Sequence, residues 1–217
     1  MMIRSRRIIL HKPDGWWLSG GIPNSVCVAA YQAKGAQGLN DSYINLANPS
    51  TYPLFPLGSL AWDITNGWIG NATDAYIKTK IIPVFGTTVI VRFSNAPTSI
   101  ISPLFGSYSG SQRDIEIIPY NGDNRIYLYN GGHKAVTGGV TSGVLAVSGN
   151  ATFKDGENQG NVSASYISQG VEIYILALNN NGSVIRRSSA NIQAIAFYSI
   201  PLSDSQISAL TNAMNAL

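Results

Sequence analysis

The sequence predicts one all-β domain, a two-sheet antiparallel jelly-roll sandwich with a short C-terminal α-helix. From about residue 75 onward, short runs of β-branched and aliphatic residues alternate with turn sequences rich in Gly, Asn and Asp. A helical pattern is convincing only in the last fifteen residues. The 217 residues are 45% hydrophobic, which is ample for a core, and β sandwiches of this size often fold as one unit.

The first clear strands lie in the middle of the chain. Thr87–Phe93 is β-branched, and its Arg92 must reach an edge, a partner or solvent. Asp114–Tyr120 alternates charged and aliphatic residues, which predicts an edge strand with Asp114 and Glu116 on its solvated face. Asn124–Tyr129 follows Asn121-Gly122-Asp123, a turn sequence typical of a hairpin.

The later strands have two kinds of pattern. Gly143–Val147 and Ala151–Lys154 flank a Gly149-Asn150 turn. Val171–Leu178 and Ile192–Tyr198 are nearly continuous apolar runs, so we expect both to lie centrally with both faces covered. The spacing of all these strands is typical of a sandwich, not of βαβ units.

The predicted helix spans residues 203–217. Pro201 ends the preceding strand, and Ser203 with Gln206 three residues later forms a capping-box pattern. Apolar residues then recur at helical spacing and predict a stripe that packs on the sandwich. These residues are Ile207, Leu210, Met214 and Leu217.

We expect residues 1–64 to form a basic arm and an aromatic, Gly-rich lead-in packed on a jelly roll of residues 65–217, with Trp62 and Trp68 as anchors. The rest of the chain holds ten basic and eleven acidic residues, so the net charge of +3 belongs to the arm. Such an arm can dock on an acidic protein surface, or it is simply a solvated lead-in. Four charges are few for nucleic-acid affinity, so nucleic acid is not an expected partner. The arm residues are Arg4, Arg6, Arg7 and Lys12.

Several segments resemble laminin-G-like, concanavalin A-like jelly rolls. Glu172–Leu217 resembles the closing segment of that family, in which an A-x-Y strand end precedes a short helix. Gly67–Ile82 resembles an early strand, although Gly70-Asn71 departs from the family pattern, and Thr152–Gly156 resembles the strand and turn of the central hairpin. Ala36–Asn48 looks like a lead-in found in tailed-phage and prophage proteins. The matching residues of the closing segment are Ala196, Tyr198, Leu202, Ser203, Ile207 and Leu210.

This resemblance covers about residues 65–217 and implies the fold without fixing the function, because the family contains lectins, adhesion modules, virion proteins and glucanases. The glucanases use carboxylates on one strand that face one side of a sheet. Asp114 and Glu116 supply acids at i and i+2 only, with Ile118 at i+4 and Gln112 at i−2. The sequence also lacks a G-x-S-x-G motif and a phosphate-binding loop. The sequence therefore predicts that the chain is not an enzyme, with a β-glucanase-type glycoside hydrolase as the less favoured alternative.

No cofactor is predicted. Calcium is the metal considered, because Asp74, Asp123 and Asp155 are loop carboxylates of the right type. No spacing selects among them, and turn formation explains each one. The two histidines, His11 and His133, do not suggest a zinc site, and His133 is interpreted as a surface residue in a turn. Cys27 is the single cysteine, so no disulfide forms within the chain, and its apolar neighbours predict burial.

Three tyrosines are candidates for glycan binding: Tyr127, Tyr129 and Tyr108. Tyr127 and Tyr129 share one face of a strand at i and i+2, as an aromatic platform requires. The favoured alternative for this pair is packing between the sheets, because tyrosine is common in strands.

The low charge content, the basic arm and the phage-like lead-in together predict a non-catalytic virion protein, such as a capsid decoration, tail or fibre subunit. In this hypothesis the jelly roll is displayed on the particle and binds other virion proteins, copies of itself as a homo-oligomer such as a trimer, and cell-surface glycans. The protein would be made in the host cytoplasm without a signal peptide, and no run of about 18 apolar residues predicts membrane insertion. The alternative is a stand-alone carbohydrate-binding lectin.

Overall fold

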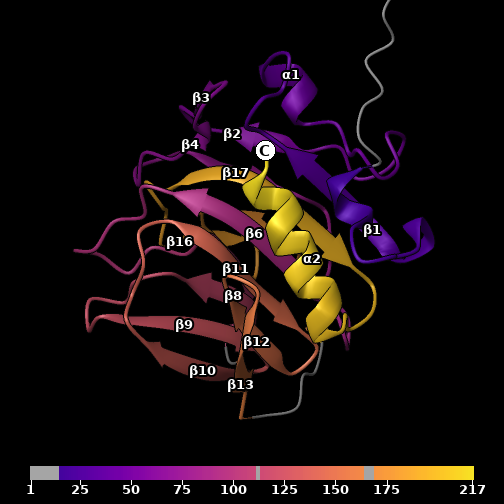
Figure 1. Cartoon of the computed structure of the whole chain (residues 1–217). Helices are drawn as coiled ribbons and strands as arrows, with labels where there is room; N and C mark the ends of the chain where they lie inside the picture. The colour runs from indigo at the N-terminus through magenta and orange to yellow at the C-terminus, as the bar shows by residue number, and fades with distance from the viewer. Residues whose placement is uncertain (1–14, 111–112, 164–168) are drawn as a thin grey trace, which may run out of the picture.

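The computed structural model describes residues 15–110, 113–163 and 169–217. Two mainly antiparallel sheets pack face to face, and α2 (Asp204–Asn215) lies across the outer side of one of them (Figure 1). The predicted all-β jelly-roll sandwich with a short terminal helix is confirmed. Short helices η1 (Trp16–Leu18), η2 (Asn24–Val26) and α1 (Leu39–Ser42) precede most of the strands.

The first sheet, sheet A, has the strand order β13-β12-β11-β6-β17-β4-β3, and β1 pairs with β17 beside β4. Its strands are β1 (Cys27–Gln32), β3 (Ala61–Asp63), β4 (Gly67–Ile69), β6 (Thr88–Ser94), β11 (Gly143–Ser148), β12 (Ala151–Lys154), β13 (Glu157–Asn161) and β17 (Asn191–Tyr198). All eight residues of β17 are buried, which confirms its predicted central position.

The second sheet, sheet B, has the order β10-β9-β8-β7-β14-β5-β2, with β15 parallel to β7 and β16 paired to β15. Its strands are β2 (Phe55–Leu57), β5 (Tyr76–Lys78), β7 (Phe105–Tyr108), β8 (Arg113–Ile118), β9 (Arg125–Asn130), β10 (Gly132–Thr137), β14 (Tyr174–Ile175), β15 (Leu178–Asn180) and β16 (Ser183–Ile185).

The main core lies between the two sheets. Alternate residues of each strand point inward, as the two-residue period of a strand requires. Sheet A contributes Val89, Val91, Phe93, Ile195 and Phe197, and sheet B contributes Ile115, Ile117, Ile126, Leu128 and Ile175, all nearly or fully buried. Residues between these positions on sheet B therefore face away from the core.

Helix α2 covers the outer face of sheet A. Its apolar stripe packs on Ile90, Val144 and Ala146, which point outward from β6 and β11. The capping box is confirmed: the Ser203 hydroxyl accepts from the Gln206 backbone N–H, and the Gln206 side chain accepts from the Ser203 N–H. The stripe comprises Ile207, Leu210 and Met214, which are fully buried, and the half-buried Leu217.

Arg92 reaches the end of this helix from sheet A. Its Nη1 donates hydrogen bonds to the backbone carbonyl oxygens of Met214, at 2.7 Å, and Leu217, at 3.1 Å. The last carbonyls of a helix lack partners within it and carry partial negative charge, so a guanidinium is a suitable donor. Of the edge, partner or solvent expected for Arg92, the structure shows a partner, which is the C-terminal end of α2.

The segment before residue 64 contributes strands to both sheets. β1 and β3 belong to sheet A and β2 belongs to sheet B. The Trp68 Nε1–H donates to the Ser42 hydroxyl and the Trp62 Nε1–H donates to the Ala33 carbonyl, both at 2.8 Å, so both tryptophans anchor this layer. The division of the chain at residue 64 remains a prediction about domain organisation.

Cys27 is buried, as expected, and burial raises the pKa of its thiol to about 12.

Two strand predictions are wrong. Val171–Leu178 is not one strand, because Leu176 has a φ of 63° and separates the antiparallel β14 from β15, which runs parallel to β7. Residues 113–118 do not form an edge strand, because β8 pairs with β7 on one side and β9 on the other.

Within the described residues, no helix is long and apolar enough to cross a bilayer.

Candidate functional site

The outer face of sheet B carries a patch of three aromatic rings, which we call the ring patch: Tyr127 and Tyr129 of β9 and His133 of β10. Tyr129 pairs directly with His133 across the β9–β10 ladder. The ring centroids lie 6.2 Å apart for the two tyrosines, 5.8 Å for Tyr127 and His133, and 5.6 Å for Tyr129 and His133. The predicted common face of the two tyrosines is therefore found on the outside of the sandwich.

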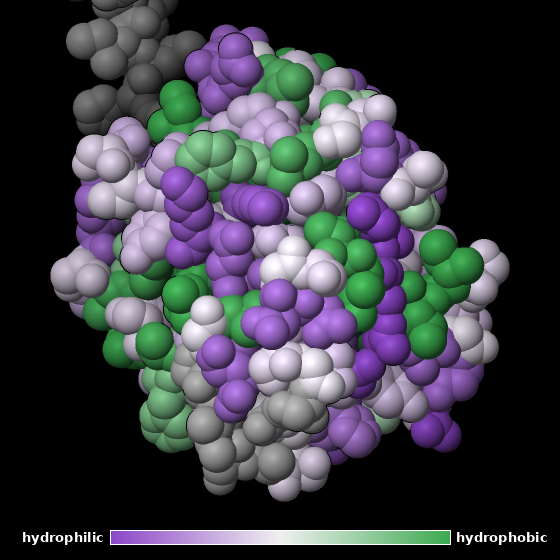
Figure 2. Space-filling view, turned by 180° about the vertical axis from the view of Figure 1, so that it is seen from behind, coloured by the Kyte–Doolittle hydropathy of each residue, from purple (hydrophilic) through white to green (hydrophobic). Residues whose placement is uncertain are grey.

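The favoured sequence interpretation, packing of Tyr127 and Tyr129 between the sheets, is wrong. Ile126 and Leu128 occupy the core positions of β9, so the tyrosines between them point outward and remain partly exposed. His133 lies in β10 instead of a turn, and its side chain is exposed. Figure 2, seen from behind the view of Figure 1, shows a face on which hydrophilic and apolar groups are mixed.

Tyr108 is separate from the ring patch. It ends β7, pairs with Arg113 in the β7–β8 ladder, and donates its hydroxyl to the Gly110 carbonyl at 2.6 Å. It remains a candidate on β7, which β8 separates from β9.

Beside the ring patch, a buried carboxylate lies between two arginines, an arrangement that we call the ion cluster. The Glu116 side chain is 0% exposed, and its Oε2 lies 2.8 Å from Arg113 Nε. Its Oε1 lies 3.9 Å from Arg186 Nη1. The Arg113 and Arg186 side chains are 28% and 33% exposed. The guanidinium of Arg113 also lies over the Tyr129 ring, 4.4 Å from its centroid, which joins the ion cluster to the ring patch.

The expectation that Asp114 and Glu116 face solvent is wrong, and the local backbone explains why. Glu116 pairs with Tyr129 on one side and with Gly106 on the other. A Cβ at Gly106 would lie 3.2 Å from Glu116 Cγ and 2.7 Å from Leu178 Cδ1, so glycine leaves the space that these side chains occupy. Sequence periodicity gives no signal for this burial, because Leu178 and Arg186 come from a distant hairpin.

Burial raises the pKa of both outward carboxyl groups of β8. The pKa of Glu116 rises to about 7, with Arg113 and Arg186 opposing part of the rise. The pKa of Asp114 rises to about 6, opposed by a backbone hydrogen bond from Gln169. The outer side of β8 therefore carries two carboxyl groups that titrate near neutral pH, next to three aromatic rings.

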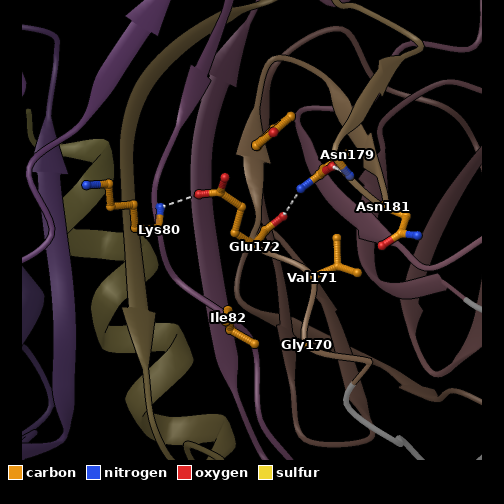
Figure 3. A pocket seen from close by; sticks show the side chains of 9 residues that line it. Lys80, Ile82, Gly170, Val171, Glu172, Asn179 and Asn181 are labelled. Carbon is orange, nitrogen blue, oxygen red and sulfur yellow. Dashed lines mark hydrogen bonds between the residues drawn. The ribbon is translucent and has the colours of Figure 1, made fainter.

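A cleft of about 480 Å³ lies elsewhere on sheet B, beside β5, β14 and β15 (Figure 3). The fold itself uses several of its polar groups. Glu172 Oε2 accepts from the Lys80 backbone N–H, and Asn179 donates to the Glu172 carbonyl, each at 2.8 Å. The Lys80 side chain points away from the cleft toward Phe55, with Nζ 4.2 Å from the ring centroid. The lining comprises Lys80, Ile82, Gly170, Val171, Glu172, Tyr174, Asn179, Asn181 and Gly182.

The calcium candidates lie in three separate loops. Asp74 Oδ1 accepts from the Ser59 backbone N–H and from the Asn71 side chain, and these hydrogen bonds lower its pKa, with the Asn71 bond the largest cause. Asp123 Oδ2 accepts from the Tyr127 hydroxyl, and Asp155 Oδ1 accepts from the Val144 backbone N–H. In the described segments, no three His, Cys, Asp or Glu side chains gather as a metal site would require.

The arm residues Arg4, Arg6, Arg7 and Lys12 lie outside the described residues, as do His11 and Gln112. Docking through the arm therefore remains a prediction.

Comparison with known proteins shows the fold. No family model and no curated protein matches this chain. A sialidase of Trypanosoma rangeli in complex with sialic acid matches with a TM-score of 0.63 and 12% identity, over 89% of this chain and 34% of that one. Domain 4 of an extracellular GH43 arabinanase from Geobacillus stearothermophilus, in complex with arabinotriose, matches with 0.62 and 13%, over 86% of this chain and 98% of that one. A botulinum neurotoxin type C structure matches with 0.62 and 8%, over 88% and 52%.

These matches correct the prediction that the chain is not an enzyme. Parts of sialidases and one domain of an arabinanase, which are glycoside hydrolases, are prominent among the solved structures that match this fold. The lack of the glucanase carboxylates was therefore not sufficient to exclude enzyme activity. The chain spans about a third of the sialidase structure, and at these identities the match concerns the fold alone. None of the structures described here is a phage protein, so the virion assignment remains a prediction.

Proposed function

We propose that this chain is a carbohydrate-binding β-sandwich module, and that the ring patch on sheet B is its binding surface. The observation that carries the proposal is the contact of Tyr127, Tyr129 and His133 on the outer face of a sheet, with Arg113 stacked on one ring. A matching domain of similar length, from an arabinanase, was solved with arabinotriose bound, which supports the ligand class.

The chemistry of the ring patch suits a sugar. A tyrosine or histidine side chain combines an apolar ring with a polar tip, and a sugar likewise combines C–H faces with hydroxyl groups. The rings are already ordered, because Tyr127 donates to Asp123 at 3.0 Å and Tyr129 lies against Arg113. Binding then requires little further ordering of side chains, which favours affinity.

The proposal can be tested on an array of neutral and acidic oligosaccharides, with arabinotriose included. We expect saturable binding by the wild-type protein and a loss of about fivefold in affinity for Tyr129→Ala, since an aromatic contact contributes about 1 kcal/mol. Phe85→Ala is the matched control, because Phe85 is 73% exposed and lies outside the ring patch. Equal loss in both variants, or no binding by the wild type, would refute the proposal.

A second candidate function is glycoside hydrolysis by Asp114 and Glu116. The observation that favours it is the pair of outward carboxyl groups with pKa values raised to about 6 and about 7, since a general acid must hold its proton near neutral pH. Glu116 is reached only if Arg113 and Arg186 move aside, because its side chain is fully buried. Reducing-end release from a bound oligosaccharide tests this. Loss of release in Glu116→Gln with binding retained would support hydrolysis, and no release by the wild type would refute it.

The sequence also supports a more specific proposal, display of this module on a phage particle as a homo-oligomer. It is supported by the phage-like lead-in and the basic arm, not by the matching structures. Co-purification with particles in fixed stoichiometry would support it, and unchanged incorporation after deletion of residues 1–12 would refute the role of the arm.

A further inference from the structure

We propose that the ligand of the ring patch carries a carboxylate or sulfate group, and that Arg113 and Arg186 bind this group. This inference rests on the proposed function and specifies an acidic sugar as the ligand class.

The first argument is the charge of the ion cluster. Two guanidinium groups approach one carboxylate, so Glu116 neutralises at most one of their two positive charges. Each guanidinium has five N–H donors in a planar fork that fits a carboxylate or sulfate. Arg113 approaches Glu116 through Nε, and both arginine side chains are about a third exposed. Donors therefore remain available on the solvent side of a carboxylate that is itself buried.

The second argument is the position of the arginines relative to the rings. Glu116 and Tyr129 are direct cross-strand partners, and the Arg113 guanidinium lies 4.4 Å from the Tyr129 ring centroid. An anionic group bound by Arg113 would therefore hold its sugar ring beside Tyr129. A neutral sugar can use the rings alone, whereas an acidic sugar uses both parts of the surface.

The third argument is that the arginines are held in place. The Arg113 side chain is fixed between the Tyr129 ring and Glu116, and the buried carboxylate also attracts Arg186. Arg186 has a φ of 52°, a left-handed backbone conformation that is uncommon for a residue other than glycine. Such conformations persist where the surrounding structure imposes them, so the backbone that carries Arg186 is held by its neighbours.

Neighbouring acids have partners of their own. Asp114 accepts a backbone hydrogen bond from Gln169. Asp123 accepts from the Tyr127 hydroxyl and lies 3.9 Å from Arg125. An anion beside Tyr129 would therefore meet the guanidinium of Arg113, which lies over that ring, with Arg186 on the other side of Glu116.

Calorimetry on the intact chain tests the inference with paired probes. The first pair is trigalacturonic acid and its methyl ester, and the second is a sulfated carrageenan tetrasaccharide, which has no carboxylates, and its desulfated form. We expect at least one acidic member to bind about tenfold or more tightly than its partner, because charge-assisted hydrogen bonds are lost with the charge. The preference should weaken as salt is raised.

Arg186→Gln should remove the preference by weakening binding of the acidic member of each pair. The matched control is Arg187→Gln, since the Arg187 guanidinium lies toward Tyr76, 5.9 Å from its ring centroid, and should leave the preference intact. Circular dichroism confirms that both variants fold. Equal affinity within both pairs, or a preference that survives Arg186→Gln, would overturn the inference. If a neutral sugar binds in a Tyr129-dependent way without any acidic preference, the inference fails and the proposed function stands; if no sugar binds at the ring patch, both fail.

Discussion

Arg113 lies over Tyr129, with its guanidinium carbon 4.4 Å from the ring centroid. The two residues come from neighbouring strands, and the same arginine holds the buried Glu116 carboxylate through Nε. One side chain therefore connects a buried charge to an exposed aromatic surface. This contact makes the outer face of sheet B a candidate for ligand binding, whereas α2 covers the outer face of sheet A.

Replacing Glu116 with glutamine should change how stability depends on pH. Burial raises the folded-state pKa of Glu116 from 4.5 to about 7, so the native protein holds this proton more tightly than the unfolded chain. The stabilisation is complete below about pH 4.5 and is lost as pH rises through about 7, a difference on the order of 3 kcal/mol. Glu116→Gln cannot ionise and should flatten this decline.

Urea unfolding between pH 4.5 and 8 measures the effect. The Glu116→Gln variant should still show a smaller decline in the free energy of unfolding, at lower pH, because the pKa of Asp114 is also raised. Glu157→Gln, on the exposed part of β13, is the control and should follow the wild type. A Glu116→Gln curve parallel to that of the wild type would show that the buried carboxylate does not titrate in this range.

Gly106→Ala should destabilise the protein by about 1–3 kcal/mol, the usual cost of overpacking a filled site. The added Cβ would lie 2.7 Å from Leu178 Cδ1 and 3.2 Å from Glu116 Cγ, so both side chains must shift. Thermal unfolding detects the loss. Gly38→Ala is the control, because the nearest group to its Cβ is a carboxylate oxygen of Asp41 at 3.6 Å. A Gly106→Ala protein as stable as the Gly38→Ala protein would contradict the packing described for Glu116.

Arg92→Met should lower the free energy of unfolding by about 1.5–3 kcal/mol, the range for hydrogen bonds that involve a charged group. The variant keeps the apolar stem of the side chain but loses both donors to the Met214 and Leu217 carbonyls. Urea denaturation measures the change, with Arg125→Met, 52% exposed, as the control. A loss below about 0.5 kcal/mol, the range of an ordinary surface substitution, would show that α2 does not depend on this contact.

The terminal helix and the central strand were predictable because local patterns determine them. The stripe from Ile207 to Met214 and the Ser203 cap specify α2 within the sequence that forms it. β17 is buried along its whole length, and most of its residues are apolar because both of its faces are covered. By contrast, the break after β14 depends on Leu176 in a left-handed conformation, for which a leucine gives no warning.

The candidate site was predictable in part. The i, i+2 spacing placed Tyr127 and Tyr129 on one face, but it did not specify which face. The strand position of His133 was missed because Gly131-Gly132 suggested a turn, whereas Gly132 opens β10. The burial of Glu116 depends on Gly106, Tyr129 and Arg186, which are brought together only by the sheet. An alternating charge pattern indicates that a side chain points away from the core. It does not indicate which residues cover that side chain.

Mapping of amide chemical shifts by NMR during titration with an oligosaccharide from the array tests the location of the site most directly. We expect the largest perturbations at Tyr127–Tyr129 and His133–Ala135, with smaller ones at Arg113 and Arg186, and none along α2. Perturbations confined to the cleft beside Glu172 and Asn179, or to the α2 side of the molecule, would contradict the assignment of sugar binding to the ring patch.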